Sequence, residues 1–244
     1  MAARAEAGDT LTMAHDISVV IPVRNGALHV REAIQSCLDQ TTPVREIIVV
    51  DDGSQDATAD IVAELGAPVV LLRQTWSGAA AAMNAGVAHA KGALLAFLDH
   101  DDIWRPEKLT VQMAEFAHRP DREAIFGGMQ QFISPEVDAA LRVRLRCPAE
   151  PQPGLAASVM LIHRMALERH GAFHGGRNAV GFMGWFMRAK ADGLRFSIAR
   201  DVVALRRLHA ANSSFHDRDV NRQQYLDVSR EMILRHRRIK SNIP

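Results

Sequence analysis

The sequence predicts an α/β fold in which a mainly parallel central sheet is flanked by helices. Short apolar runs rich in β-branched residues recur along the first hundred residues, helical patterns separate them, and polar residues follow several of them. Strands that alternate with helices of this length are typical of βαβ units and a parallel sheet. The four runs are ISVVIP (17–22), EIIVVDD (46–52), PVVLLRQ (68–74) and GALLAFLD (92–99).

The segments between these runs are predicted to be helices. Segment 27–40 places its apolar side chains on one face at helical spacing. Segment 56–66 has Asp56 as its predicted N-cap and Gly66 at its end, and segment 77–92 is rich in alanine. The first hundred residues therefore indicate three βα units followed by a fourth strand.

Beyond residue 103 the pattern is looser. Pro106 stands in the first turn of a predicted helix, a position that proline tolerates, and several prolines between 134 and 155 predict a long loop. Basic residues at the end of the last helix face either solvent or an anionic partner. The remaining predicted elements are helices at 106–119, 184–193 and 218–239 and strands at 124–133, 157–163 and 195–209.

The composition limits the function classes. The 244 residues carry a formal net charge of +1, whereas a general nucleic-acid-binding protein needs a strong basic excess. Cys37 and Cys147 are the only cysteines and lie far apart in the sequence, which fits a reducing cytoplasm. No uninterrupted apolar run of about 18 residues is present, so we expect membrane contact to be peripheral at most.

The stretch LAFLDHDDIW (95–104) ends an apolar strand in clustered carboxylates. Such groups repel one another and are costly to desolvate, so either a cation compensates them or water surrounds them. Asp99 and Asp101 could chelate one Mg²⁺ or Mn²⁺ ion, because these ions prefer carboxylate and phosphate oxygens. In the alternative interpretation the turn is fully solvated and Asp102 caps the following helix.

Polar residues also follow the first and second strands, so three groups meet at the edge of the sheet where α/β proteins bind ligands. Asp52 can accept a nucleobase imide N–H or a ribose hydroxyl, or it can simply belong to a turn. Gly78 and the small residues after it either let a phosphate or sugar approach the backbone or form an ordinary helix.

Four motifs, in the same order along the chain, resemble those of the family 2 glycosyltransferases, which have the GT-A fold and use nucleotide-diphospho-sugars. The motifs are VVIPVRN (19–25), VVDDGS (49–54), the set Gly78, Asn84 and Gly86, and FLDHDD (97–102). The likeness is dense over 17–110, weak over 111–180, and partly returns at 188–214.

The resemblance implies a nucleotide site and a metal site. His209 belongs to Arg207-Leu208-His209, which resembles an R-x-H element of the family, although taken alone it is equally an ordinary surface histidine. A Mn²⁺ or Mg²⁺ ion is expected at Asp99, Asp101 and His209. Nucleotide contacts are expected from Pro22, Val23, Arg24, Asn25, Asp52, Gly53, Gly78, Asn84, Asp99 and His100.

Two departures from the family pattern bear on the mechanism. Met83 stands where the family usually has an arginine, so one cationic contact is missing or is supplied from elsewhere. Inverting members also carry an acidic base in the segment that matches 178–185, where this chain has no Asp or Glu. Asp102 and His174 are candidates for a substitute base, and Trp185 is either a stacking floor for a sugar or a core aromatic residue.

We therefore expect a metal-dependent, inverting glycosyltransferase that moves a sugar from a nucleotide diphosphate, with a UDP-sugar as the first candidate, to a hydroxyl acceptor. The acceptor could be a glycan, a lipid carrier, a peptide or a small molecule. One alternative is a catalytically deficient relative that binds the nucleotide sugar and acts as a partner or regulator. Another is a nucleotidyltransferase, which the absence of a Gly-rich loop with several basic residues after the first strand disfavours.

The expected organisation follows from the same resemblance. A single GT-A domain would have a nucleotide-binding half and an acceptor half, and Met13 is a second candidate for the start of the chain. The sequence predicts no oligomeric state. The segments are a disordered leader (1–15), the GT-A domain (16–215, divided into 16–102 and 103–215) and a C-terminal helix (216–244).

Overall fold

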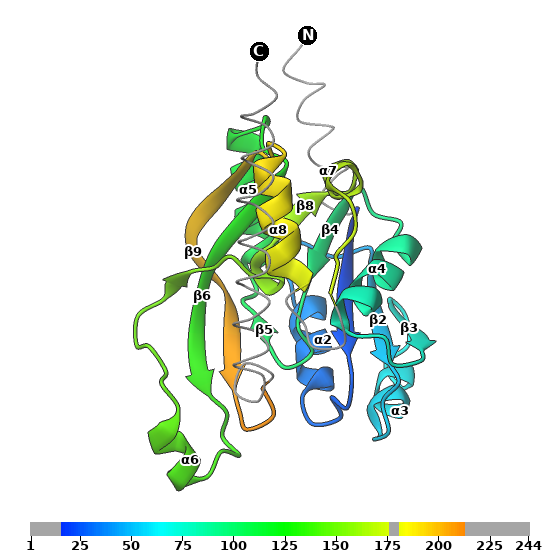
Figure 1. Ribbon diagram of the computed structural model, residues 1–244, viewed down its shortest axis with the longest axis vertical. Helices are drawn as coiled ribbons and strands as arrows, with labels where there is room; N and C mark the ends of the chain where they lie inside the picture. The colour runs from blue at the N-terminus through cyan, green and yellow to red at the C-terminus, as the bar shows by residue number, and fades with distance from the viewer. Residues whose placement is uncertain (1–15, 176–180, 213–244) are drawn as a thin grey trace, which may run out of the picture.

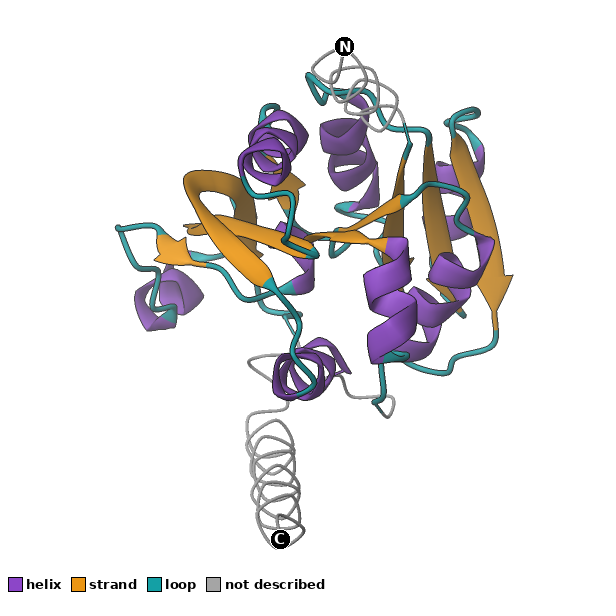
Figure 2. Cartoon of the chain, turned by 90° about the horizontal axis from the view of Figure 1, so that it is seen from above, coloured by secondary structure: helices purple, strands orange, loops and turns teal. Residues whose placement is uncertain are grey.

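The computed structural model describes residues 16–175 and 181–212, which form a curled central sheet with helices on both faces (Figures 1 and 2). The predicted leader at 1–15 and the whole predicted C-terminal helix at 216–244 lie outside the described residues. The sheet has the strand order β3-β2-β1-β4-β8-β6-β9-β5, and β7 pairs with β6. The α/β class predicted from the sequence is confirmed.

The first four strands are parallel, as their patterns predict. In the centre of this half, Val19 of β1 lies opposite Ile47 of β2 on one side and Ala96 of β4 on the other. The strands are β1 (Ile17–Val23), β2 (Glu46–Asp52), β3 (Val69–Gln74) and β4 (Leu94–Phe97). The helices that connect them are α2 (Val30–Leu38), α3 (Thr58–Ala63) and α4 (Ala79–His89).

Beyond β4 the sheet is mixed. Strand β8 is antiparallel to both β4 and β6, whereas β9 runs parallel to β6 along nearly its whole length. The strands of this half are β5 (Ile103–Trp104), β6 (Ala124–Ile133), β7 (Gln152–Pro153), β8 (Leu161–His163) and β9 (Phe196–Leu208). Its helices are α5 (Lys108–His118), α6 (Ala139–Arg144), α7 (Arg164–His170) and α8 (Gly181–Ala191).

The differences from the sequence prediction concern short elements. The predicted loop at 134–155 contains the short helix α6, which lies at the lower end of Figure 1, and the two-residue strand β7, which pairs with the middle of β6. The predicted strand at 157–163 divides into a 3₁₀ turn, Ala157–Val159, and β8. Elements of two to seven residues are too short to display a hydrophobic period, so contacts with the rest of the fold decide them.

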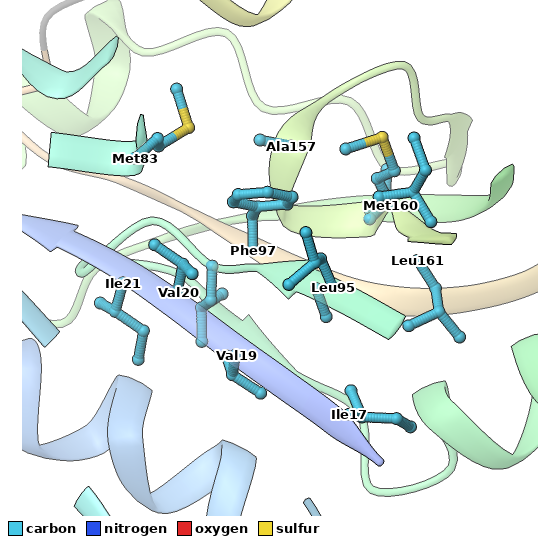
Figure 3. Close-up of a cluster of buried hydrophobic side chains, with 14 of the residues drawn as sticks. Ile17, Val19, Val20, Ile21, Met83, Leu95, Phe97, Ala157, Met160 and Leu161 are labelled. Carbon is cyan, nitrogen blue, oxygen red and sulfur yellow. The ribbon is translucent and has the colours of Figure 1, made fainter. Parts of the chain in front are cut away.

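The core is built on β1, whose residues are all buried on both faces. Side chains alternate across the strand, so Ile17, Val19 and Ile21 pack on one face and Val20 packs on the other. Figure 3 shows Phe97 of β4 among these side chains. Full burial of such a side chain contributes about 1.5–3 kcal/mol to the free energy of folding, so β1 is a major source of the stability of the core.

A polar network crosses this core behind the end of β4. The indole N–H of Trp104 donates to the carbonyl of Ser158 (2.8 Å), and the Gln112 amide donates to that of Val159 (2.8 Å). Lys108 is fully buried, donates to the Gln112 side-chain oxygen (2.5 Å) and lies over the Trp104 ring. These bonds fix the 3₁₀ turn, because they pair carbonyl groups that would otherwise be buried without partners.

We expect Lys108 to make stability depend on pH. Burial lowers the pKa of its ammonium from 10.5 to about 7. Below pH 7 the folded protein holds a buried charge, whereas between pH 7 and 10.5 the folded state is neutral at this residue and the unfolded chain is still protonated. The contribution of Lys108 to the free energy of unfolding should therefore rise with pH by up to about 1.4 kcal/mol per unit in this window.

The Lys108→Met variant should lack this rise. Urea unfolding of both proteins below pH 7 and near pH 10 measures the difference, with the exposed Lys190→Met as the matched control. The stability of the unmodified protein relative to Lys108→Met should increase between the two conditions. A difference that stays constant would show that the buried lysine does not change its protonation on folding.

Candidate active site

The turns after β1 and β2 are joined by hydrogen bonds at the carboxyl edge of the sheet. The Asn25 N–H donates to the Ser54 hydroxyl (2.9 Å), and the Asn25 side-chain oxygen accepts from the Gln55 N–H (2.8 Å). The Gly26 N–H donates to the Thr58 hydroxyl (2.9 Å). Asn25 adopts a left-handed φ of 53°, which an asparagine tolerates better than most residues. The two turns therefore form one fixed rim.

Asp52 ends β2 and organises the entry to α4. One of its oxygens accepts from the Gln74 amide (2.7 Å) and the Ser77 N–H (2.8 Å), and the other accepts from the Gly78 N–H (2.7 Å). The residue is only 3% exposed. Its carboxylate thus already holds the loop after β3, and a contact with a nucleobase or ribose stays a prediction.

Asp99 is the first residue of the acidic turn, residues 99–102, which follows β4. Its N–H donates to the Ser158 hydroxyl (3.1 Å), which connects the turn to the polar network behind it. The residue reaches solvent, yet the surrounding protein removes much of the water that would solvate its carboxylate. This desolvation, together with the neighbouring charge of Asp101, raises the pKa of Asp99. The two carboxylates are therefore close enough to repel each other.

Asp101 is held by two side chains from the end of the described chain. Its Oδ2 is 2.9 Å from Nε2 of His209 and accepts from the Asn212 amide (3.1 Å). Burial opposes ionisation of Asp101, but the hydrogen bond with His209 and the positive charges of His100 and His209 outweigh it and lower the pKa to about 2. Asp101 therefore carries a full negative charge at neutral pH.

Asp102 is buried in the protein, in contrast to the exposed Asp99. It is 3% exposed, and its Oδ1 accepts from the Arg207 N–H (3.1 Å). Burial and the charges of Asp99 and Asp101 raise the pKa of this carboxyl well above its usual value. The geometry supports a role in anchoring β9, and the assignment of Asp102 as a catalytic base stays a prediction.

Arg207 supports the backbone of the acidic turn. Its guanidinium is almost fully buried and donates to the Asp101 carbonyl (2.9 Å), the Ser134 hydroxyl (3.0 Å) and the Glu32 carboxylate (2.5 Å). It also lies over the Phe132 ring. One side chain thus joins the acidic turn, helix α2 and the end of β6.

A second chain of contacts runs beside Arg207. The His209 ring lies 5.0 Å from the ring of His29, which is paired with Glu136 (3.1 Å). Burial and the charge of Arg207 lower the pKa of His29, although Glu136 opposes this. Glu136 in turn accepts from Ser134 (2.5 Å), so the segment after β6 is connected to the metal-candidate residues.

The remaining predicted site residues have varied surroundings. Pro22 and Val23 are buried at the end of β1. The His100 ring lies against Gly26, where a Cβ would come within 2.6 Å of it, so glycine permits the first turn and the acidic turn to touch. The Gly53 turn has φ 73° and packs on the backbone of the loop after β3.

Two residues that the resemblance places near the substrate have structural partners. Asn84 uses both ends of its amide on the backbone of Phe173, at 2.8 and 3.0 Å. Trp185 is fully buried and donates to the Gly171 carbonyl (2.9 Å), so of its two interpretations the core aromatic residue is the one observed. His174 is exposed on the loop that Asn84 holds.

The acidic turn suits a hard divalent cation that is shared with a ligand. Among residues 16–175 and 181–212, no group of three or more His, Cys, Asp and Glu is arranged to hold a metal alone. Mg²⁺ and Mn²⁺ are nevertheless commonly held by one or two carboxylates, with phosphate oxygens and water as the other ligands. The exposed Asp99 and the ionised Asp101 fit that donor set.

Sequence reasoning missed the residues that support the acidic turn. Asn212, Glu32 and His29 were not among the candidates, and Arg207 was named only as part of a motif. The clustered carboxylates do indicate that a cation is needed, but nothing in the sequence shows which of the 29 basic residues lies there. Arg207 and Asp101 are 106 positions apart.

Comparison with known proteins agrees with this geometry. The family model described as glycosyl transferase family 2 matches residues 18–192. An uncharacterized glycosyltransferase of Rickettsia prowazekii is 42% identical over 97 residues, which is 40% of this chain and 30% of that protein. The glycosyltransferase AglE of Haloferax volcanii is 26% identical over 200 residues, 77% of this chain and 65% of that protein. The chain spans about a third of the length of the first curated relatives that it matches.

Solved structures share the fold. TarS 1–349 of S. aureus, crystallised in complex with UDP-GlcNAc, has a TM-score of 0.65 at 18% identity, over 81% of this chain and 60% of that chain. The same protein in complex with UDP has a TM-score of 0.62 at 18% identity, over 79% of this chain and 60% of that chain. At this identity the likeness concerns the fold alone.

We expect the Arg207→Met variant to lose stability. It removes buried hydrogen bonds to the Asp101 carbonyl and the Ser134 hydroxyl, which should cost about 1–3 kcal/mol of the free energy of unfolding. Glu32 is half-exposed and can be hydrated again, so its loss should add little. Urea unfolding measures the change.

The matched control is Arg200→Met, because Arg200 lies on the same strand and is exposed. Its effect should stay within about 0.5 kcal/mol, as is usual for surface substitutions. Equal stability of the two variants would contradict the role assigned to Arg207.

Proposed function

The chain belongs to glycosyl transferase family 2, and from this premise we propose that it transfers a sugar from a nucleotide-diphosphate donor to a hydroxyl acceptor. The observation that carries the proposal is the convergence of the turns after β1, β2 and β4 on one rim, with Asp52 on one side and Asp99 and Asp101 on the other. This is the edge at which parallel α/β sheets bind ligands.

The proposed donor is a UDP-sugar. Two crystal structures of TarS, which shares the fold, contain UDP-GlcNAc and UDP respectively. On this chain the nucleoside would lie along the turns after β1, β2 and β3, with the diphosphate toward the acidic turn. The family resemblance supports the same arrangement for Pro22, Val23 and Asp52.

The proposed cofactor is Mn²⁺ or Mg²⁺, held by Asp99, Asp101 and His209. Such an ion would neutralise the charge that develops on the departing diphosphate. Asp101 supports this assignment because it is ionised at neutral pH, and its partner His209 keeps its carboxylate oriented. Arg207 fixes the backbone of the same turn, and Nε2 of His209 would exchange its bond with Asp101 for one to the ion.

The proposed stereochemical course is inversion, in which a base removes the proton of the acceptor hydroxyl. A positioned base typically contributes about 10²–10⁴-fold to the rate. Of the two candidates, His174 is exposed and Asp102 is buried, so accessibility favours His174. The acceptor itself could be a glycan, a lipid carrier, a peptide or a small molecule.

The absence of an acidic residue at 178–185 favours a second candidate function, a nucleotide-sugar-binding relative without transferase activity. In the described part of that segment, Phe182 packs among Trp185, Phe186 and Phe126.

We further propose a cytoplasmic location. Over the described residues, every helix is too short or too polar to cross a membrane.

We expect Asp101→Asn to abolish metal-dependent nucleotide binding, because the variant keeps the shape of the side chain and removes the charge that the cation needs. Isothermal titration of the full chain with UDP, in the presence and absence of Mn²⁺, measures this. Asp121→Asn, at an exposed turn, is the matched control and should bind as the unmodified protein does. Unchanged Mn²⁺-dependent affinity in Asp101→Asn would remove the metal assignment.

A donor-hydrolysis assay separates the enzyme from the inactive relative. Release of UDP from a UDP-sugar in the presence of Mn²⁺ supports a transferase, since water can replace the acceptor. Tight UDP binding without turnover of any donor supports the binding relative. A protein that binds no nucleoside diphosphate would contradict both functions.

A further inference from the structure

An arginine and a tryptophan from different loops are stacked on the rim of the site. Arg24 follows β1 and Trp76 follows β3, and Cζ of Arg24 lies 3.9 Å from the centroid of the Trp76 ring. The Trp76 side chain is partly solvent-exposed. Within residues 16–175 and 181–212, Arg24 makes neither an ion pair nor a hydrogen bond, and its Nε is enclosed by protein without a partner. The cation is therefore held by the indole alone.

The position of this pair is well defined. The loop that carries Trp76 follows β3 and is held by Asp52, which accepts hydrogen bonds from the N–H groups of Ser77 and Gly78. On the other side, a Cβ on Gly53 would lie 3.0 Å from the backbone nitrogen of Trp76, so the turn after β2 packs directly on this loop. The tryptophan is thus fixed by its backbone, and it fixes the arginine.

The pair lies on the side of β1 that faces away from the acidic turn. In the sheet order β3-β2-β1-β4, Trp76 follows one end of this half and Asp99 and Asp101 follow the other. Because Arg24 leans on Trp76, its guanidinium is turned toward β3. If the diphosphate binds near the acidic turn, the part of the donor that reaches Arg24 is the nucleobase.

Asp52 has little hydrogen-bonding capacity left for the edge of a nucleobase. The two oxygens of Asp52 already accept three hydrogen bonds, and Met83, where the family usually has an arginine, is packed in the core (Figure 3). A guanidinium, by contrast, is planar and weakly hydrated on its faces, so it can stack on an aromatic ring on each side. One face of Arg24 is covered by Trp76, and the residue as a whole is partly exposed.

We propose that Arg24, held flat by Trp76, is the surface on which the nucleobase of the donor stacks. The inference rests on the proposed function and assigns a new positioning role to Trp76, which acts through Arg24. Arg24 then supplies the cation that is absent at Met83, but it contacts the face of the base rather than a phosphate.

The experiment is isothermal titration of the full chain with UDP and with inorganic pyrophosphate, both with Mn²⁺. The variants are Arg24→Lys, which keeps the charge and removes the plane, Arg24→Ala, and Trp76→Ala. Each should weaken UDP binding by roughly tenfold, within the range for loss of one base stack, and leave pyrophosphate binding unchanged. Arg31→Lys is the matched control, since Arg31 is exposed and, within the described part of the chain, pairs with Glu64.

Three results would overturn the proposal. If Arg24→Lys binds UDP normally and Arg24→Ala does not, the contact is ionic and reaches a phosphate. If all three variants bind UDP normally, the pair has no part in binding, although the proposed function still stands. If the unmodified protein binds no UDP, the proposed function and this inference fail together. Trp76→Phe, which keeps an aromatic face, should bind more tightly than Trp76→Ala if the indole holds the arginine.

Discussion

The structure depends on the compensation of three carboxyl groups within four residues at the end of β4. Without a partner, Asp99, Asp101 and Asp102 would repel one another where the protein also removes water. His209 binds the Asp101 carboxylate, while Arg207 donates to the Asp101 carbonyl through its side chain and to the Asp102 carboxyl through its backbone N–H. Because Arg207 belongs to β9, this strand must pass beside the acidic turn, and the second half of the sheet is thereby fixed against the first.

Polar groups are also paired within the protein at Asp52 and at the 3₁₀ turn. Asp52 neutralises three donors of the loop after β3, so the carboxylate that the sequence suggests for ligand contact is also what builds the rim. Behind the acidic turn, Trp104, Gln112 and Lys108 pair the carbonyls of the 3₁₀ turn. At this rim Asp52 and Asp102 are buried and serve as scaffold, whereas Asp99 is exposed and Arg24 is partly exposed.

Sequence reasoning predicts the parallel half of the fold well because buried strands and amphipathic helices are local patterns. It also finds the acidic turn, since adjacent carboxylates stand out in any sequence. It does not find their partners, because Arg207 and Asn212 contact Asp101 although they lie more than a hundred positions away in the sequence. The same limit explains Asn84, whose amide is used by the Phe173 backbone 89 positions away. Long-range pairs leave no local period to detect.

The electrostatics of the turn also show how neighbouring carboxyls acquire different tasks. His209 binds Asp101 and lowers its pKa, whereas burial and the charges of Asp99 and Asp101 raise the pKa of Asp102. Asp99 lies between these extremes and reaches solvent, so it is the carboxyl whose charge a bound cation would most change. The protein thus binds Asp101 and Asp102 with its own groups, and Asp99 is the carboxyl that stays exposed to solvent.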